Sequence, residues 1–293
     1  SKNDKIIRGN VLSVSQLAVY GNLQQVKNIL SKYGLKKIII PKGFDTKNKI
    51  KSWNGTKQEN NTNIKTLLKL FGAKKTTICD FSSYESPDVT FDLNYKVKNN
   101  HINKYDLILD FGTLEHIFDV PQALENYVRM TKKNGHIIIC TPCSNMIDHS
   151  FYMFSPTLFF DYFENNGFEI YKCFLKTRSP YYPYNRTKFY EYLFQGNEIP
   201  ILPNKCTEII IFAKKIKTLK KVLKPNQSIY TTNPEWKNSK NYKNDNIPNK
   251  NNINLRIFKE TIKKLIMSKF TPFFIQKIFF SIYRGKNLKK LYL

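Results

Sequence analysis

The chain has 293 residues, of which 41% are hydrophobic and 14% aromatic. That is enough to bury a core for one α/β domain with added elements, or for two small domains, and it excludes global disorder. The formal net charge is +26, and residues 214–293 carry 20 basic against 3 acidic residues. Such a charge favours an anionic partner, which could be a phosphorylated substrate, a nucleic acid or an anionic membrane surface.

Helix and strand patterns alternate along most of the sequence. In chain order they predict a helix over 11–34, a strand over 36–40, a helix over 63–71, strands over 76–81, 89–91 and 105–110, a helix over 121–133, a strand over 136–140, a helix over 155–163, and strands over 168–175 and 208–213. The alternation predicts βαβ units, and therefore an α/β fold with a Rossmann-like, doubly wound, mostly parallel sheet.

The same patterns divide the chain into four parts. We expect an N-terminal helical segment over 1–34, the Rossmann-like domain over 35–216, a polar basic linker over 217–254, and a basic amphipathic helical tail over 255–293. Two apolar helices broken at Pro272 are predicted within 255–283, where basic residues accompany aromatic ones. They could contact a membrane surface or a partner, cover the sheet, or form a homodimer interface.

The cysteines and the apolar segments bear on location. The five cysteines form an odd set without a disulfide-framework spacing, so we interpret them as free thiols in a reducing cytoplasm. The lone pair Cys140 and Cys143 could serve a zinc or redox site, but no second pair accompanies it, and we expect no metal. No stretch reaches the ~18 apolar residues of a spanning helix, so a cytoplasmic protein is expected, with peripheral membrane contact left open.

Acidic residues follow three of the predicted strands. Asp80 ends the second strand, Asp92 the third and Asp110 the fourth, while Thr141 and Pro142 follow the fifth. Ligands of open parallel sheets bind beyond the carboxyl ends of the strands. Three acids in register suit a site that hydrogen-bonds a ribose and an adenine and that tolerates a sulfonium.

Two stretches resemble a known enzyme family. The sequence YDLILDFGTLEHIFDVPQALENYVRMTKKNGHIIICTP, residues 105–142, resembles the second half of class I S-adenosylmethionine-dependent methyltransferases. The sequence GAKKTTICDFSSYESPDVTFDLN, residues 72–94, resembles a branch of that family associated with glycan modification. The resemblance covers roughly residues 35–213. It implies S-adenosylmethionine as cofactor and methylation of a sugar, or of a phosphorylated or nucleotide-linked glycan precursor of a surface polysaccharide.

The resemblance also implies cofactor-binding residues. It places Asp80 at the ribose hydroxyls, Asp92 and Leu93 beside the adenine, Gly43 where the backbone approaches the cofactor, and Asp110, Gly112 and Thr113 at the methionyl end. Purely structural alternatives are a turn cap for Asp80, an Asx-turn for Asp92 and an ordinary turn glycine for Gly43. The family's first strand usually ends in a turn of several glycines, whereas IIIPKGFD, residues 38–45, has one. A non-catalytic, methyltransferase-like binding module is therefore an alternative.

Histidines are the natural candidates for the chemical step. Methyl transfer is an in-line displacement that depends on alignment, and a hydroxyl nucleophile gains from a base whose pKa is near neutral. Of the four histidines, His116 and His149 lie in loops expected to border the acceptor, so both are candidate bases. Glu115 and Tyr152 are candidate acceptor contacts, with helix capping and core packing as their alternatives. His136 opens a buried strand and is interpreted as structural.

The partner prediction is a small-molecule or glycan acceptor, of anionic character given the charge. A nucleic-acid methyltransferase that uses the basic tail is a further alternative. It is less favoured because the sequence has no recognised nucleic-acid-binding motif.

Overall fold

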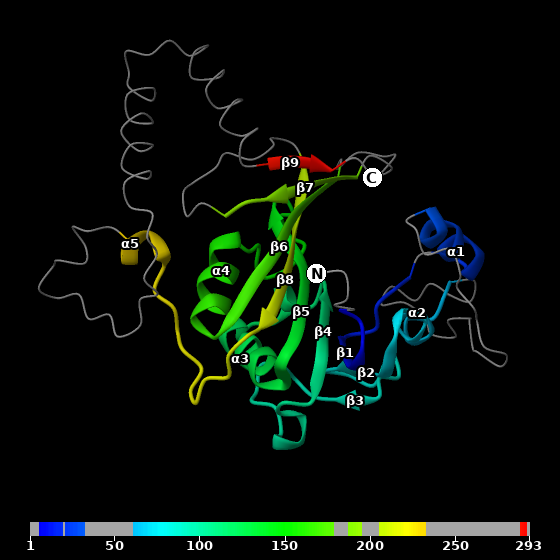
Figure 1. Ribbon diagram of the computed structural model, residues 1–293, viewed down its shortest axis with the longest axis horizontal. Coiled ribbons are helices and arrows are strands. Elements are labelled where there is room, and N and C mark those ends of the chain that lie inside the picture. Colours follow the sequence, from blue (N-terminus) through cyan, green and yellow to red (C-terminus); the bar gives the residue numbers. More distant parts are fainter. Residues whose placement is uncertain are drawn as a thin grey trace, which may run out of the picture.

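The structure, a computed structural model, describes residues 6–19, 21–32, 61–178, 187–194, 205–232 and 288–291. Figure 1 shows the elements around one sheet. In chain order they are β1 (Gly9–Val14), α1 (Leu23–Lys32), α2 (Ile64–Phe71), β2 (Ala73–Asp80), β3 (Val89–Thr90), the 3-10 turn η1 (Asn99–His101), β4 (Tyr105–Phe111), the 3-10 turn η2 (Leu114–His116), α3 (Val120–Met130), β5 (Thr131–Ser144), α4 (Pro156–Asn165), β6 (Phe168–Arg178), β7 (Lys188–Tyr192), β8 (Cys206–Lys215), α5 (Ser228–Thr232) and β9 (Leu288–Leu291).

The sheet has two halves of different character. Its strand order is β3-β2-β1-β4-β5-β8-β6-β7-β9. The pairings from β3 to β5 are parallel, and those from β5 to β9 are antiparallel. The order reverses direction at β1 and β4, where ligands bind in doubly wound folds. The predicted α/β, Rossmann-like class is confirmed.

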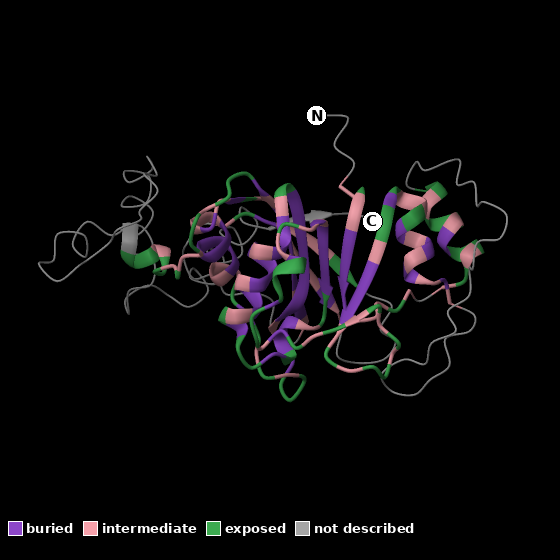
Figure 2. Cartoon of the chain, turned by 90° about the horizontal axis from the view of Figure 1, so that it is seen from below, coloured by how far each residue is buried: buried purple, intermediate pink, exposed green. Residues whose placement is uncertain are grey.

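Alternating side chains bury both faces of the parallel half. Val11, Leu107 and Ile138 point to one face, where they pack with Ile64 and Leu68 of α2. Their neighbours along the strands belong to a larger cluster on the other face, which α3 and α4 cover; it includes Leu12, Ile108, Ile137, Ile139, Leu124, Tyr127, Phe159 and Phe163. The two-residue period of a strand therefore supplies two cores at once. Figure 2 shows the buried strands between the helices of the two sides.

Local signals set the helix ends. Asn63 caps α2 by accepting a hydrogen bond from the Lys65 backbone N–H, and Gly72 closes that helix at φ 116°. Asp119 caps α3 through the Gln122 backbone N–H, and Ser155 caps α4 through that of Thr157. These residues are ordinary caps, and they confirm the predicted helices at 63–71, 121–133 and 155–163 to within a few residues.

The first predicted helix is wrong at its start. Residues 9–14 form β1, the strand between β2 and β4, and the helix is confined to Leu23–Lys32. The sheet therefore begins before residue 35. Its first strand has the sequence GNVLSV, in which Ser13 interrupts the apolar residues. The local pattern therefore does not predict a strand, and pairing with the flanking strands stabilises one here.

Other differences are smaller. Lys132 and Lys133 belong to β5 rather than to the last turn of α3. Residues 288–291, predicted as part of a helical tail, form β9 and pair with β7. The predicted strand over 36–40, most of the linker over 217–254, and the predicted helices within 255–283 lie outside the described residues. None of the helices in the described ranges is both long and apolar enough to cross a membrane.

Candidate functional site

The carboxyl ends of β1, β2 and β4 lie in one row, with β5 running beside them. Val14 of β1 pairs with Cys79 of β2 and with Asp110 of β4, and Asp110 pairs with Ile139 of β5. The residues one step further along each strand are Ser15, Asp80, Phe111 and Cys140. The loops after β1, β2 and β4 therefore begin side by side at the edge where doubly wound sheets bind ligands, whereas β5 continues to Ser144 before its loop begins.

The turn after β1 carries two features that the sequence pattern did not reveal. Ser15 has φ 62°, a left-handed conformation that is uncommon outside glycine, and its backbone N–H donates to the carbonyl of Cys79 at 2.8 Å. Both polar atoms of the Gln16 amide are buried without a hydrogen-bond partner among the described residues. Because a buried unpaired amide is costly, the Gln16 side chain is suited to meet a ligand at this turn.

The exits of β2 and β3 are acidic turns. Asp80 Oδ1 accepts from the Ser82 backbone N–H at 3.0 Å, so one of its oxygens caps the turn. Asp92 Oδ1 accepts from the backbone and side-chain amides of Asn94, both at 2.8 Å, which is an Asx-turn. Leu93 is buried in the core beside α3 rather than exposed at the edge. For Asp80 and Asp92, the structural alternatives are thus present, and they leave the second carboxylate oxygen of each for a ligand.

Asp110 acts from inside the fold. Its carboxylate is fully buried and accepts from the backbone N–H groups of Thr113 and Leu114, at 2.9 and 3.1 Å, and from the Tyr127 hydroxyl at 2.7 Å. Burial raises the pKa of Asp110 to about 7 against the opposing effect of these donors. We therefore assign Asp110 to positioning the loop after β4 rather than to direct contact with a ligand.

The loop after β4 is drawn toward β1. The Thr113 hydroxyl donates to the carbonyl of Val14 at 3.3 Å, and Gly112 has φ 98°. A Cβ added at Gly112 would lie 3.5 Å from Glu115 Oε1. Gly112 is therefore favoured by its backbone conformation, and it leaves the approach to Glu115 open. Gly43, the other glycine predicted to contact a cofactor, lies outside the described residues.

Glu115, His116 and His149 come together to form the Glu–His–His cluster. Their ligand-type atoms all lie within 4.8 Å of one another, and Glu115 Oε1 is 3.8 Å from His149 Nε2. The two imidazole rings are 5.4 Å apart at an angle of 57°. The cluster joins η2 to the loop after β5, although 33 positions separate its two histidines in the sequence.

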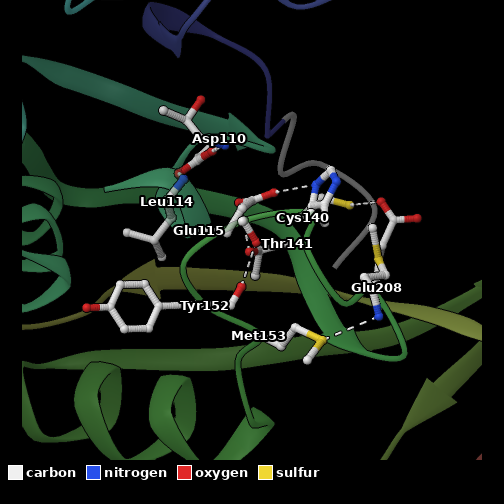
Figure 3. Close-up of polar contacts among 12 residues, drawn as sticks. Asp110, Leu114, Glu115, Cys140, Thr141, Tyr152, Met153 and Glu208 are labelled. Atoms are coloured by element: carbon white, nitrogen blue, oxygen red, sulfur yellow. Dashed lines mark hydrogen bonds and ion pairs between the residues drawn. The ribbon is translucent and has the colours of Figure 1, made fainter. Parts of the chain in front are cut away.

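The three residues of this cluster differ in burial: Glu115 is buried, whereas His116 and His149 are exposed. Glu115 is 1% exposed, and its Oε2 accepts from the Thr141 hydroxyl at 2.9 Å, as Figure 3 shows. The pKa of Glu115 is raised, chiefly by burial. The pKa of His116 is lowered, first by burial and then by the charge of His149. A buried, anchored carboxylate thus faces two imidazoles that solvent can reach.

Exposed apolar side chains surround this edge. The loops after β2, β3, β4 and β5 expose the following residues, which we call the apolar rim: Phe81, Tyr84, Tyr95, Phe118, Ile147 and Phe151. Phe118 and Phe151 meet edge to face with ring centroids 6.0 Å apart. Tyr152, a predicted acceptor contact, donates its hydroxyl to the Phe118 carbonyl at 2.9 Å and thereby links the two loops. Concentrated apolar exposure of this kind marks binding surfaces.

The other histidines lie elsewhere. His136 is buried at β5, where its ring meets Tyr171 edge to face, which agrees with its structural interpretation. His101 is buried and hydrogen-bonded to the Tyr105 hydroxyl at 2.9 Å.

Comparison with known proteins finds distant structural likeness only. No family model matches the chain, and no curated protein matches it. A Listeria monocytogenes protein described as an S-adenosylmethionine-dependent methyltransferase matches 73% of this chain and 92% of its own, at 12% identity and a TM-score of 0.38. The 1,6-didemethyltoxoflavin-N1-methyltransferase of Burkholderia thailandensis, with bound 1,6-didemethyltoxoflavin and S-adenosylhomocysteine, matches 72% of each chain at 12% identity and a TM-score of 0.34.

The CMeT domain structure of the citrinin polyketide synthase matches 72% of this chain at 7% identity and a TM-score of 0.34, and the match spans about half, 47%, of that structure's chain. TM-scores this low carry no argument about activity.

Proposed function

We propose that the protein is an S-adenosylmethionine-dependent methyltransferase whose acceptor presents a hydroxyl group to the Glu–His–His cluster. The proposal rests on two groups of residues that lie next to each other along one edge of the sheet, which we call the first and the second half-site. Beyond β1 and β2 lie an unpartnered buried amide, at Gln16, and an acidic turn, at Asp80. Beyond β4 and β5 lies a carboxylate with two imidazoles.

The first half-site suits the cofactor. The second oxygen of Asp80 can accept from ribose hydroxyls, and the Gln16 amide can both donate and accept at the methionyl carboxylate and ammonium. The left-handed turn at Ser15 stands where a glycine turn is usual and gives the backbone a similar course. Asp80 and Glu115 provide negative charge that favours a sulfonium.

The second half-site suits proton removal. Bound S-adenosylmethionine supplies a methyl group on a positively charged sulfur. The acceptor oxygen forms the new C–O bond as the S–C bond breaks, and the sulfur keeps that electron pair and becomes a neutral thioether. His149, whose Nε2 lies 3.8 Å from Glu115 Oε1, is suited by its place in the loop after β5 to accept the hydroxyl proton.

For the acceptor we propose a sugar hydroxyl, in a free or nucleotide-linked glycan precursor. The support is the aromatic character of the apolar rim, since ring faces such as those of Phe118 and Phe151 pack against the apolar faces of sugars. The basic balance of the whole chain, +26, suits an acceptor that carries phosphate.

Titration calorimetry with S-adenosylhomocysteine tests the cofactor half. We expect binding to the wild type and a roughly 10-fold weaker affinity for Asp80→Ala and for Gln16→Ala, because each removes one ligand hydrogen bond worth about 1.4 kcal/mol. Gln24→Ala, which changes an exposed glutamine on α1, is the matched control and should bind as the wild type does. No binding at millimolar concentration would refute the proposal.

A further inference from the structure

We propose that Glu115, His116 and His149 bind a divalent metal ion of the Mn²⁺ or Zn²⁺ class. The three side chains offer two imidazole nitrogens and one carboxylate oxygen. A set of two histidines and one carboxylate that leaves coordination positions open is a recurrent metal-binding arrangement in proteins. The proposed metal site follows from the positions of these three side chains and does not depend on the proposed methyltransferase activity. Only its use in catalysis rests on the proposed methyl transfer.

The geometry is close to that of a bound ion. The ligand atoms lie within 4.8 Å of one another, and Glu115 Oε1 is 3.8 Å from His149 Nε2. Ligands about 2.1 Å from a tetrahedral ion are roughly 3.4 Å apart, so the imidazoles need to move inward by about 1 Å. His116 and His149 are exposed at their outer sides and can make this adjustment by rotation.

The carboxylate is held ready for such a role. Thr141 donates to Oε2 and leaves Oε1 facing His149. The backbone carbonyl of Glu115 accepts from the Tyr152 N–H at 3.3 Å, which fixes the loop after β5 against η2. A Cβ added at Gly112 would lie 3.5 Å from Oε1, so the glycine leaves this space beside the oxygen free. Outer hydrogen bonds of this kind orient ligands in metal sites.

The donor set selects the class of ion. Ca²⁺ and Mg²⁺ prefer all-oxygen surroundings, whereas two imidazoles favour transition metals. Methyl transfer needs no redox change, so an ion such as Mn²⁺ or Zn²⁺ meets the chemical requirement. The Glu115 carboxylate supplies the one anionic ligand of the set.

Three protein ligands leave one or more positions for an acceptor oxygen. In the ion-bound form both imidazoles are ligands, and His149 no longer serves as the base. Coordination instead lowers the pKa of the acceptor hydroxyl, whose proton passes to water. The ion would thus hold the acceptor at the edge of the apolar rim and activate it in one step.

Mn²⁺ binding to the full-length, untagged protein tests the site. Paramagnetic resonance follows the loss of the free-ion signal, and nitrogen couplings in the bound form report imidazole ligands. We expect one bound Mn²⁺, displaced by Zn²⁺ because zinc binds such sites more tightly. Mg²⁺ should not displace it. Zn²⁺ serves only as competitor, since the partly exposed Cys143 and Cys206 could bind it separately.

Variants decide which residues hold the ion. His149→Asn and His116→Asn should each weaken Mn²⁺ binding by more than about 10-fold and remove one of the two imidazole nitrogen couplings, and Thr141→Val should weaken binding by about 10-fold through Glu115. Glu169→Gln, at an exposed position on β6 outside the loops of the cluster, is the matched control and should leave the affinity unchanged. Circular dichroism checks that each variant is folded.

Two results would overturn the site: no Mn²⁺ binding at millimolar concentration, or binding that both histidine variants retain. These outcomes are distinct from failure of the methyltransferase proposal. A protein that binds Mn²⁺ at the cluster but not S-adenosylhomocysteine keeps the metal site and loses the proposed reaction. A protein that binds only S-adenosylhomocysteine does the reverse.

Discussion

Tyr127, on the buried side of α3, shows how one hydroxyl supports the candidate site. It supplies the shortest of the hydrogen bonds to Asp110. In Tyr127→Phe the buried carboxylate keeps only its two backbone donors, so the pKa of Asp110 should rise above about 7. We expect the free energy of unfolding to fall by about 1–3 kcal/mol, measured in urea at pH 7.

The matched control is Tyr95→Phe, because Tyr95 is 72% exposed. Its unfolding free energy should stay within about 0.5 kcal/mol of the wild type. Equal effects of the two substitutions would show that the Asp110 hydrogen bond contributes nothing specific.

Lys215 is a buried amine whose effect depends on pH. It is 2% exposed, and its Nζ donates to the carbonyls of Val128 and Thr131, both at 2.7 Å. Burial lowers its pKa from 10.5 to about 8. Since the unfolded chain then binds more protons between pH 8 and 10.5, the contribution of Lys215 to stability is least below pH 8 and rises with pH across that window.

We therefore expect the unfolding free energy of the wild type, relative to Lys215→Met, to increase by about 3 kcal/mol between pH 8 and 10.5. Chemical denaturation at several pH values measures this difference. Lys220→Met, at an exposed lysine, should show no such trend. A flat difference for Lys215→Met would mean that its amine titrates normally.

At the scale of elements, β1 shows where sequence patterns succeed and fail. β4 could be predicted because its apolar run is continuous, and α2 because Asn63 and Gly72 mark its ends. In β1 Ser13 interrupts the apolar residues, Ser15 and Gln16 follow the strand directly, and a helical period fits the whole stretch equally well. Pairing with β2 and β4 decides the matter, and that pairing is not a local property.

Some residues of the candidate site could likewise be chosen from the sequence, and others could not. Glu115, His116 and His149 could be chosen from the sequence because their residue types suit chemistry and they follow predicted strands. Their mutual contact depends on the fold of the loop after β5, where Asp148 takes a left-handed conformation. Gln16 could not be chosen, because it was assigned to a helix, and its unpartnered amide is visible only in three dimensions.

The start of β1 depends on Gly9. It has φ 61°, and a Cβ added there would collide with the carboxylate of Asp106, which accepts from Asn10 N–H and Lys132 Nζ. Gly9→Ala should therefore reduce the unfolding free energy by about 1–3 kcal/mol. In an Asp106→Ala background the cost should be smaller, because the collision is gone. Equal costs in both backgrounds, in a double-mutant cycle, would place the strain in the backbone alone.

At the scale of the whole molecule, the two halves of the sheet have different roles: the parallel half carries the candidate site, and the antiparallel half extends and covers the sheet. The parallel half carries the strand exits of the candidate site, whereas β8, β6, β7 and β9 extend the sheet away from it. β9, from near the C-terminal end of the sequence, pairs with β7 and covers an edge that would otherwise be open. This segment therefore belongs to the sheet, although its basic residues suggested a helical tail.

Deleting residues 288–293 tests this separation. The backbone groups of β7 that face β9 lose their partners, so amide hydrogen exchange should accelerate by an order of magnitude or more over Lys188–Tyr192. Exchange in β1 and β4 should be unchanged, because several strands lie between them and the deleted edge. Affinity for S-adenosylhomocysteine and for Mn²⁺ should also stay as in the full chain. If the deletion instead weakened the binding of either ligand, the antiparallel half of the sheet would be energetically coupled to the site. A change at the β7 edge can reach the ends of β5 and β4 only through β7, β6 and β8.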